Sequence, residues 1–171
     1  TPPPVVIIGH GVVVNKEMMT ALSLELAAGG CVVAALDWRG HGASGGRLGS
    51  RDGLARDLAA VSADLPRHMP NADMRRLALV GFSMGGPPTF RYAAGSEATR
   101  AWVGLGTVAP AGAGGPQNPP NALLLIGTLD EAFRPERVRA TMDRLLTDGP
   151  AVYNRRYGSI ADGTAREVRL L

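Results

Sequence analysis

The sequence of 171 residues has little of what defines several large classes of protein. Its one cysteine, Cys31, excludes both a disulfide framework and a zinc site built from cysteine ligands. No apolar run reaches the roughly 20 residues that a membrane-spanning helix needs. Charged residues make up only 19% of the chain and apolar residues 45%, which excludes a disordered chain and leaves enough material for a hydrophobic core. Length and composition therefore predict one globular domain.

Lysine is also nearly absent. Of the 18 lysine and arginine residues only Lys16 is a lysine, and the formal net charge is +3. The arginine pairs Arg75-Arg76 and Arg155-Arg156 are too short to form basic tracts, and the other arginines are scattered. Domains that bind nucleic acids gather their basic side chains on one face or stripe. We therefore expect no nucleic-acid partner, and the lack of a long apolar run predicts no membrane partner.

Short apolar runs alternate along the chain with longer amphipathic stretches. The runs predict strands at residues 5–8, 31–36, 77–82, 102–105, 122–126 and 167–171. The stretches predict helices at residues 15–28, 53–68 and 135–146, with another starting at about Met84. Apolar strands that alternate with helices are typical of a parallel sheet covered on both faces. The expected fold class is therefore α/β, a three-layer α/β/α arrangement around a mostly parallel, doubly wound sheet of about six strands.

The sequence Gly81-Phe82-Ser83-Met84-Gly85 fits the pattern G-x-S-x-G and stands between a predicted strand and a predicted helix. In that setting the pattern indicates a nucleophile elbow, a turn so tight that the residues two positions before and two positions after the serine must be small. We therefore predict that Ser83 is a nucleophile and that Gly81 and Gly85 permit the turn. The alternative is that Ser83 only caps the helix that follows.

A second motif, His10-Gly11, directly follows the first predicted strand. A loop at this place can direct a backbone N–H at an oxyanion, together with the N–H of the residue after the nucleophile. We accordingly predict that the backbone N–H groups of Val12 and Met84 form an oxyanion hole. His10 is either a general base or a hydrogen-bonded residue that shapes the loop, and we favour the second interpretation.

A third motif, D-W-R-G-H-G-A-S at residues 37–44, follows the second predicted strand. With all three motifs in this order, the chain resembles the α/β-hydrolase superfamily, in its serine esterase, prolyl-oligopeptidase-like or serine-aminopeptidase-like branch. The resemblance extends over essentially the whole chain, from Val5 to Leu171. It implies that Asp37 and Arg39 support the loop through hydrogen bonds and a charge pair, and that His41 is a loop residue.

The resemblance also implies an acid after the fifth predicted strand, where the sequence reads Gly127-Thr128-Leu129-Asp130. Asp130 matches the expected place, with Glu131 as its nearest competitor. The role of Asp130 would be to hold a histidine in the correct tautomer and to stabilise the imidazolium. No metal or organic cofactor is implied by this chemistry.

The histidine itself is missing from its expected place. The superfamily order is serine, then acid, then histidine, whereas His10, His41 and His68 all precede Ser83. We therefore expect the catalytic histidine to lie beyond Leu171 in a longer parent protein, and the 171-residue chain to be nearly inactive by itself. The single domain, residues 1–171, is likewise expected to lack the first strands of the superfamily, which would leave the strand at 31–36 as an uncovered sheet edge through which the chain self-associates.

These observations predict a serine hydrolase that acts on a small-molecule ester, thioester, or amide or peptide bond through an acyl-serine intermediate. The segment between the fourth and fifth predicted strands is too short for a large lid. The alternative is a non-catalytic binding module with the same fold, which only the missing histidine supports. A nucleotide-binding domain fails on its motif, because Val14 stands where G-x-G-x-x-G requires glycine.

Overall fold

The computed structural model describes residues 1–110, 121–127, 130–133, 138, 153–158 and 165–170. Within these residues the strands are β1 (Pro4–Gly9), β2 (Val32–Leu36), β3 (Asp73–Phe82), β4 (Thr99–Leu105), β5 (Ala122–Gly127), β6 (Tyr153–Gly158) and β7 (Ala165–Leu170). The helices are α1 (Thr20–Ala28), α2 (Arg51–His68) and α3 (Gly86–Ala94), with two short 3-10 helices, η1 (Lys16–Met19) and η2 (Ser83–Gly85).

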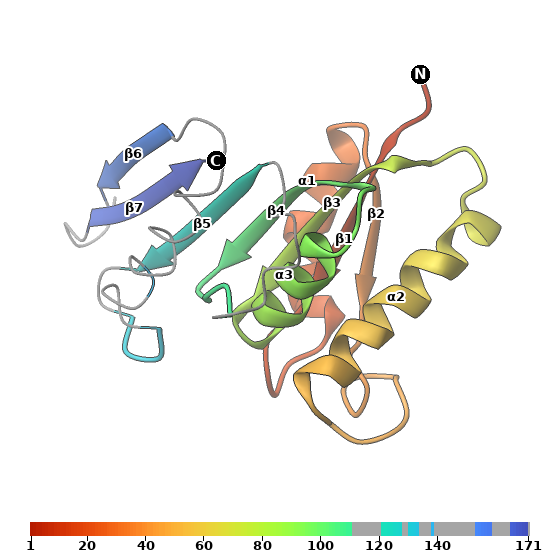
Figure 1. Ribbon diagram of the computed structural model, residues 1–171, viewed down its shortest axis with the longest axis horizontal. Coiled ribbons are helices and arrows are strands. Elements are labelled where there is room, and N and C mark those ends of the chain that lie inside the picture. Colours follow the sequence, from red (N-terminus) through yellow and green to blue (C-terminus); the bar gives the residue numbers. More distant parts are fainter. Residues whose placement is uncertain (111–120, 128–129, 134–137, 139–152, 159–164, 171) are drawn as a thin grey trace.

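The strands form one sheet in the order β2-β1-β3-β4-β5-β7-β6 (Figure 1). Strands β1 to β5 are parallel to one another, which confirms the predicted fold class. The order places β1, β3 and β4 inside the parallel part of the described sheet and β2, which matches the predicted strand at 31–36, at one edge.

The carboxyl-terminal end of the chain differs from the prediction. The last strand, β7, pairs antiparallel with β5. Strand β6, which was not predicted, pairs antiparallel with β7. The sequence of β6, Tyr-Asn-Arg-Arg-Tyr-Gly, has no apolar run, so its pattern gave no strand signal. Only residues 159–164 separate β6 from β7, and a parallel pair would need a crossover of a dozen or more residues. The predicted helix at 135–146 lies outside the described residues, apart from Val138.

Helices cover both faces of the parallel strands (Figure 1). Side chains alternate along a strand, so Val5 and Ile7 of β1 lie in one core cluster and Val6 and Ile8 in the other. The first cluster packs against α2 and α3, through residues such as Leu58. The second packs against η1 and α1, and it holds the partly buried Cys31. None of the described helices is long and apolar enough to cross a bilayer.

The register of the sheet aligns the carboxyl ends of its parallel strands. Gly9 at the end of β1 pairs with Leu36 on one side and with Gly81 on the other, and Gly81 pairs with Gly104 of β4. The segments that follow these strands therefore meet at one end of the sheet. They are the segments that carry the sequence motifs.

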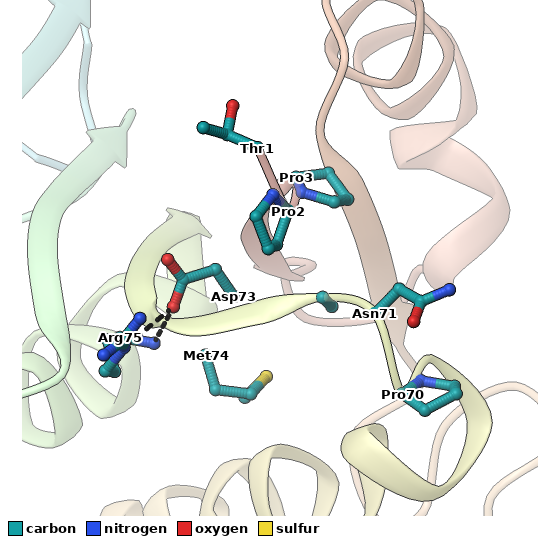
Figure 2. A pocket seen from close by; sticks show the side chains of 9 residues that line it. Thr1, Pro2, Pro3, Pro70, Asn71, Asp73, Met74 and Arg75 are labelled. Carbon is teal, nitrogen blue, oxygen red and sulfur yellow. Dashed lines mark hydrogen bonds and ion pairs between the residues drawn. The ribbon is translucent and has the colours of Figure 1, made fainter.

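The opposite end of the sheet, where β3 begins, holds a cavity of about 660 Å³ (Figure 2). It is lined by the first three residues of the chain and by residues 70–75. Its one polar pair is Asp73 with Arg75, whose Nε donates to Oδ1 over 3.3 Å. The full length of β3 separates this cavity from the motifs.

Candidate active site

Ser83 is the first residue of η2 and directly follows β3, and its backbone φ is +49°. The left-handed region is uncommon for a residue other than glycine, and such positions gather at functional sites. The neighbouring glycines are required by close approach. A Cβ on Gly81 would lie 2.3 Å from Thr89 Oγ1, and one on Gly85 would lie 2.4 Å from the carbonyl oxygen of Gly9. The segment therefore has the strained strand-to-helix turn that the G-x-S-x-G pattern predicts.

Ser83 is not the N-cap of the helix that follows. Phe82 occupies the N-cap position of η2 and Gly85 that of α3, and neither cap has a side-chain hydrogen bond. Among the described residues, none forms a hydrogen bond with the Ser83 hydroxyl, while the Ser83 carbonyl accepts one from Thr107 Oγ1 over 2.6 Å. The capping alternative is therefore wrong. Pro87 and Pro88 are accommodated because they lie in the first turn of α3, which starts after the 3-10 turn.

His10 is fully buried and both of its ring nitrogens are occupied. Nδ1 lies 2.6 Å from the carbonyl oxygen of Gly11, and Nε2 lies 3.2 Å from the backbone N–H of Trp38. This network assigns a neutral ring that donates from Nδ1 and accepts at Nε2. Burial lowers the pKa of His10 below its ordinary value, in keeping with a neutral ring. This arrangement agrees with the interpretation that His10 shapes the loop.

The loop after His10 lies directly against the elbow. A Cβ on Gly11 would be 3.0 Å from the Phe82 ring and 3.2 Å from Ser83 Cβ. The next residue is Val12, which is exposed, and among the described residues none accepts a hydrogen bond from its N–H. The N–H of Met84 belongs to the turn of η2 that follows Ser83. The two predicted oxyanion donors thus lie on two segments that are in contact.

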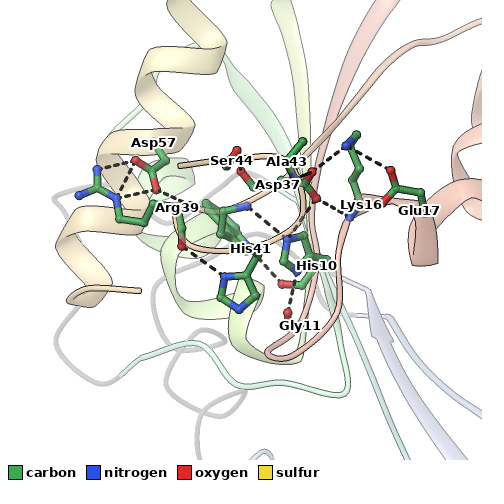
Figure 3. Close-up of polar contacts among 11 residues, drawn as sticks. His10, Gly11, Lys16, Glu17, Asp37, Arg39, His41, Ala43, Ser44 and Asp57 are labelled. Carbon is green, nitrogen blue, oxygen red and sulfur yellow. Dashed lines mark hydrogen bonds and ion pairs between the residues drawn. The ribbon is translucent and has the colours of Figure 1, made fainter. Parts of the chain in front are cut away.

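The carboxylate of Asp37, the residue directly after β2, accepts three hydrogen bonds (Figure 3). It accepts from the N–H of Lys16 at 2.8 Å, from Lys16 Nζ at 2.6 Å and from the N–H of Ala43 at 3.0 Å. Burial opposes ionisation, but the hydrogen bonds and charge of Lys16, with the Ala43 N–H, outweigh it and lower the pKa of Asp37 to about 2. The carboxylate is therefore charged throughout the neutral range, as its expected supporting role requires.

Arg39 and His41 also hold the loop after β2. Arg39 Nε donates to both carboxylate oxygens of Asp57 on α2 at 2.9 Å, and this hydrogen bond lowers the pKa of Asp57. His41 Nδ1 lies 3.2 Å from the carbonyl oxygen of Arg39, and its ring centre is 5.2 Å from that of His10. His68 is remote from these groups, because it ends α2 and contacts Asp64.

Asp130 lies beside the end of β4. Its Oδ2 would be 3.8 Å from a Cβ on Gly106, and Gly106 precedes Thr107, the residue that binds the Ser83 carbonyl. Asp130 Oδ1 accepts a hydrogen bond from the N–H of Phe133 at 2.7 Å. The fold thus brings the predicted acid to the end of the sheet that carries Ser83. In the described part of the chain no three His, Cys, Asp or Glu side chains are grouped as metal ligands.

A family model with the description "Serine aminopeptidase, S33" matches residues 1–156 of the chain. The chain belongs to this serine aminopeptidase family. It is also similar to a serine hydrolase without a lid from Xanthomonas campestris, with 25% identity and a TM-score of 0.70 over 87% of this chain and 69% of the other. An esterase from Pyrococcus furiosus has 26% identity and a TM-score of 0.55 over 63% of this chain and 42% of its own.

A further similar structure is an α/β serine hydrolase homologue from Coxiella burnetii, at 23% identity and a TM-score of 0.70 over 84% of this chain and 74% of the other. At that identity the likeness concerns the fold alone. Together with the family match, the similar structures show that the chain belongs to the α/β-hydrolase superfamily, as the three sequence motifs had suggested.

Sequence reasoning missed two residues that support the predicted site. Lys16 binds Asp37, and Thr107 binds the Ser83 carbonyl. Trp38, for which the sequence favoured neither a cleft-lining nor a structural role, donates its Nε1–H to the carbonyl oxygen of His10 at 2.9 Å. The one available signal was that Lys16 is the single lysine of a chain whose other basic residues are arginines.

Proposed function

We propose that this chain carries the nucleophile, oxyanion hole and acid of a serine hydrolase that cleaves ester, thioester or small amide bonds. The observation that carries the proposal is Ser83, held at positive φ on a turn whose flanking glycines have no room for a side chain. Ser83 Oγ attacks the substrate carbonyl, and an acyl-serine intermediate forms that water then hydrolyses.

The two backbone donors are proposed to be the N–H groups of Val12 and Met84. Charge develops on the carbonyl oxygen as the tetrahedral intermediate forms, and donors fixed before the reaction stabilise it without reorganising. The contact of Gly11 with Ser83 supports this assignment, because it keeps the two donor segments together. Gly85 packs against the carbonyl oxygen of Gly9, and this close approach also keeps the turn after Ser83 beside the segment that carries Val12.

The general base is proposed to be a histidine other than His10 and His68, oriented by Asp130. Both ring nitrogens of His10 are occupied, by the Gly11 carbonyl and the Trp38 N–H, and His68 lies on α2 beside Asp64. We expect the base from outside these 171 residues, with His41 as the internal competitor because its ring lies close to that of His10. Without its base, the triad keeps only the modest rate that the oxyanion hole and binding supply.

The substrate is proposed to be a small molecule that enters an open site. Strand β4 ends at Leu105 and β5 begins at Ala122, so only residues 106–121 connect these neighbouring strands. That length leaves no room for a large helical lid between them. The similarity to a serine hydrolase without a lid supports an open site, and the similarity to an esterase supports an ester as the first substrate to test.

The test is labelling of Ser83 by a fluorophosphonate, followed by intact-mass spectrometry, with p-nitrophenyl acetate turnover beside it. We expect slow labelling of this chain, none in Ser83→Ala, and much faster labelling and turnover in a longer protein that contains it. Wild-type protein that is never modified at Ser83 would refute the hydrolase and favour a binding module. Equal turnover by the short and long proteins would refute an external base, and loss of that turnover in His41→Ala would assign the base to His41.

A further inference from the structure

The loop from His10 to Lys16 is attached at both ends to the same neighbouring segment (Figure 3). At its start, His10 is held by Trp38, whose backbone N–H meets Nε2 and whose indole N–H meets the His10 carbonyl. At its end, Lys16 donates its backbone N–H and its Nζ to the carboxylate of Asp37. Two consecutive residues after β2 therefore hold the two ends of one loop.

The residue between these ends shows that the loop is under constraint. Val13 has a φ of +56°, in the region that β-branched residues most strongly avoid. Its side chain is 88% exposed, so packing of that side chain cannot stabilise the unfavourable backbone. The conformation must therefore be imposed by the fixed ends of the loop. Releasing one end would let Val13 relax, and the loop would move with it.

Movement of this loop would displace the elbow, because Gly11 packs so closely that an added Cβ would lie 3.0 Å from the Phe82 ring and 3.2 Å from Ser83 Cβ. Val12 lies between that contact and Val13. An oxyanion donor works over a narrow range of about 2.7–3.1 Å to the developing charge. A misplacement of about 1 Å in a catalytic site is enough to cost a large part of the rate.

We propose that Lys16 is a positioning residue for the oxyanion hole: its Nζ bond to Asp37, added to that of its backbone N–H, holds the loop so that Val12 presents its N–H beside Ser83. This inference rests on the proposed function, because it takes Ser83 as nucleophile and Val12 as donor. Asp37 suits the task, because its side chain is only 3% exposed and is itself fixed by Ala43. A charge-assisted hydrogen bond to such a group is shorter and stronger than a neutral one.

The chain offers a matched control for Lys16. Its Nζ also lies 3.2 Å from Glu17, whose side chain is exposed and adjacent in sequence. That pair connects neighbouring residues and ties the loop to nothing else. The variant Glu17→Gln therefore removes one charge partner of Lys16 and keeps the attachment to Asp37. Lys16→Met removes the charged Nζ bond at nearly constant size and keeps the backbone N–H bond, and Lys16→Arg restores a charged donor.

The experiment measures two properties of wild type and these three variants: amide hydrogen exchange by mass spectrometry, and the rate of Ser83 labelling by a fluorophosphonate. In Lys16→Met we expect faster exchange in residues 10–16, unchanged exchange in β3, and labelling about tenfold slower. This is less than the roughly 100-fold or greater loss that follows removal of an oxyanion donor. Lys16→Arg should recover to within about threefold of wild type, and Glu17→Gln should match wild type.

The outcomes distinguish a failure of the positioning role of Lys16 from a failure of the proposed hydrolase function. Wild-type labelling rates in Lys16→Met would overturn the positioning role while leaving the hydrolase intact. Faster exchange throughout the molecule, β3 included, would also overturn it, because Lys16 would then act on global stability. A wild-type chain that is not labelled at Ser83 would overturn the hydrolase and, with it, any role for Lys16 in an oxyanion hole.

Discussion

Gly85 is a position at which one added carbon atom should damage the candidate site. A Cβ there would lie 2.4 Å from the carbonyl oxygen of Gly9 and 2.8 Å from that of His10. Ordinary contacts between such atoms begin at about 3.5 Å, so Gly85→Ala requires a displacement of about 1 Å. The obstacle is backbone, and β1 cannot move freely because it is paired with β2 and with β3.

The size of the effect follows from that geometry. Overpacking of a rigid site costs about 1–3 kcal/mol, and the upper end applies here because no flexible side chain can move aside. We therefore expect Gly85→Ala to lower the free energy of unfolding by about 3 kcal/mol. The displaced residues, Gly9 and His10, lead into the loop whose Val12 N–H is the proposed oxyanion donor, so Ser83 labelling by a fluorophosphonate should fall by on the order of 100-fold.

Urea denaturation followed by tryptophan fluorescence suits this measurement, because Trp38 and Trp102 are both fully buried. The control is Gly45→Ala, since no heavy atom lies within 4 Å of a Cβ at that glycine. Its unfolding free energy should stay within about 0.5 kcal/mol of wild type. If Gly85→Ala is as stable as Gly45→Ala and is labelled at the wild-type rate, the argument from close approach is refuted.

Three further predictions concern acid stability, loop strain and association. Because the pKa of Asp37 falls from 3.8 to about 2 on folding, its stabilisation is complete above about pH 5 and is lost as the pH falls to 2. The difference in unfolding free energy between wild type and Asp37→Asn should therefore shrink by about 2 kcal/mol over that range, and a constant difference in urea titrations would contradict this. Val13→Asn should raise the free energy of unfolding by about 1 kcal/mol, because asparagine tolerates positive φ; a lower thermal midpoint would argue against strain at this residue. The β2 edge should support self-association that grows with concentration in sedimentation velocity, and a monomer at every concentration tested would oppose it.

The parallel part of the sheet and the position of Ser83 were predictable because their signals are local. Apolar runs of the right length marked β1 to β5, and the glycines around Ser83 are the residues that its turn sterically demands. Strand β6 and the antiparallel direction of β7 were not, because β6 is polar and the direction of β7 depends on its pairing with β5, which is far away in sequence. The sequence pattern carries no signal for the direction of a strand, so the last strand was assigned to a parallel sheet.

The supporting contacts of the site were hidden for a different reason. Asp37 could be expected to support its loop, but nothing in the sequence says that its partner is Lys16, since residues 16 and 37 meet only once β1 and β2 are side by side. The fully occupied ring of His10 likewise depends on Trp38, from the segment that follows β2. Such cross-strand partners depend on register, and register is a property of the folded sheet.

The central place of β1 also governs the order in which the chain can assemble. Val5 pairs with Val32 on one side and with Leu77 on the other, so β1 is enclosed only after β3 has been synthesised. Gly85 packs against the carbonyl of Gly9, so the turn at Ser83 cannot take its final shape until that pairing exists. Folding dominated by such distant pairings is slow, and during the delay the valines and isoleucines of β1 are exposed to chaperones and to other nascent chains.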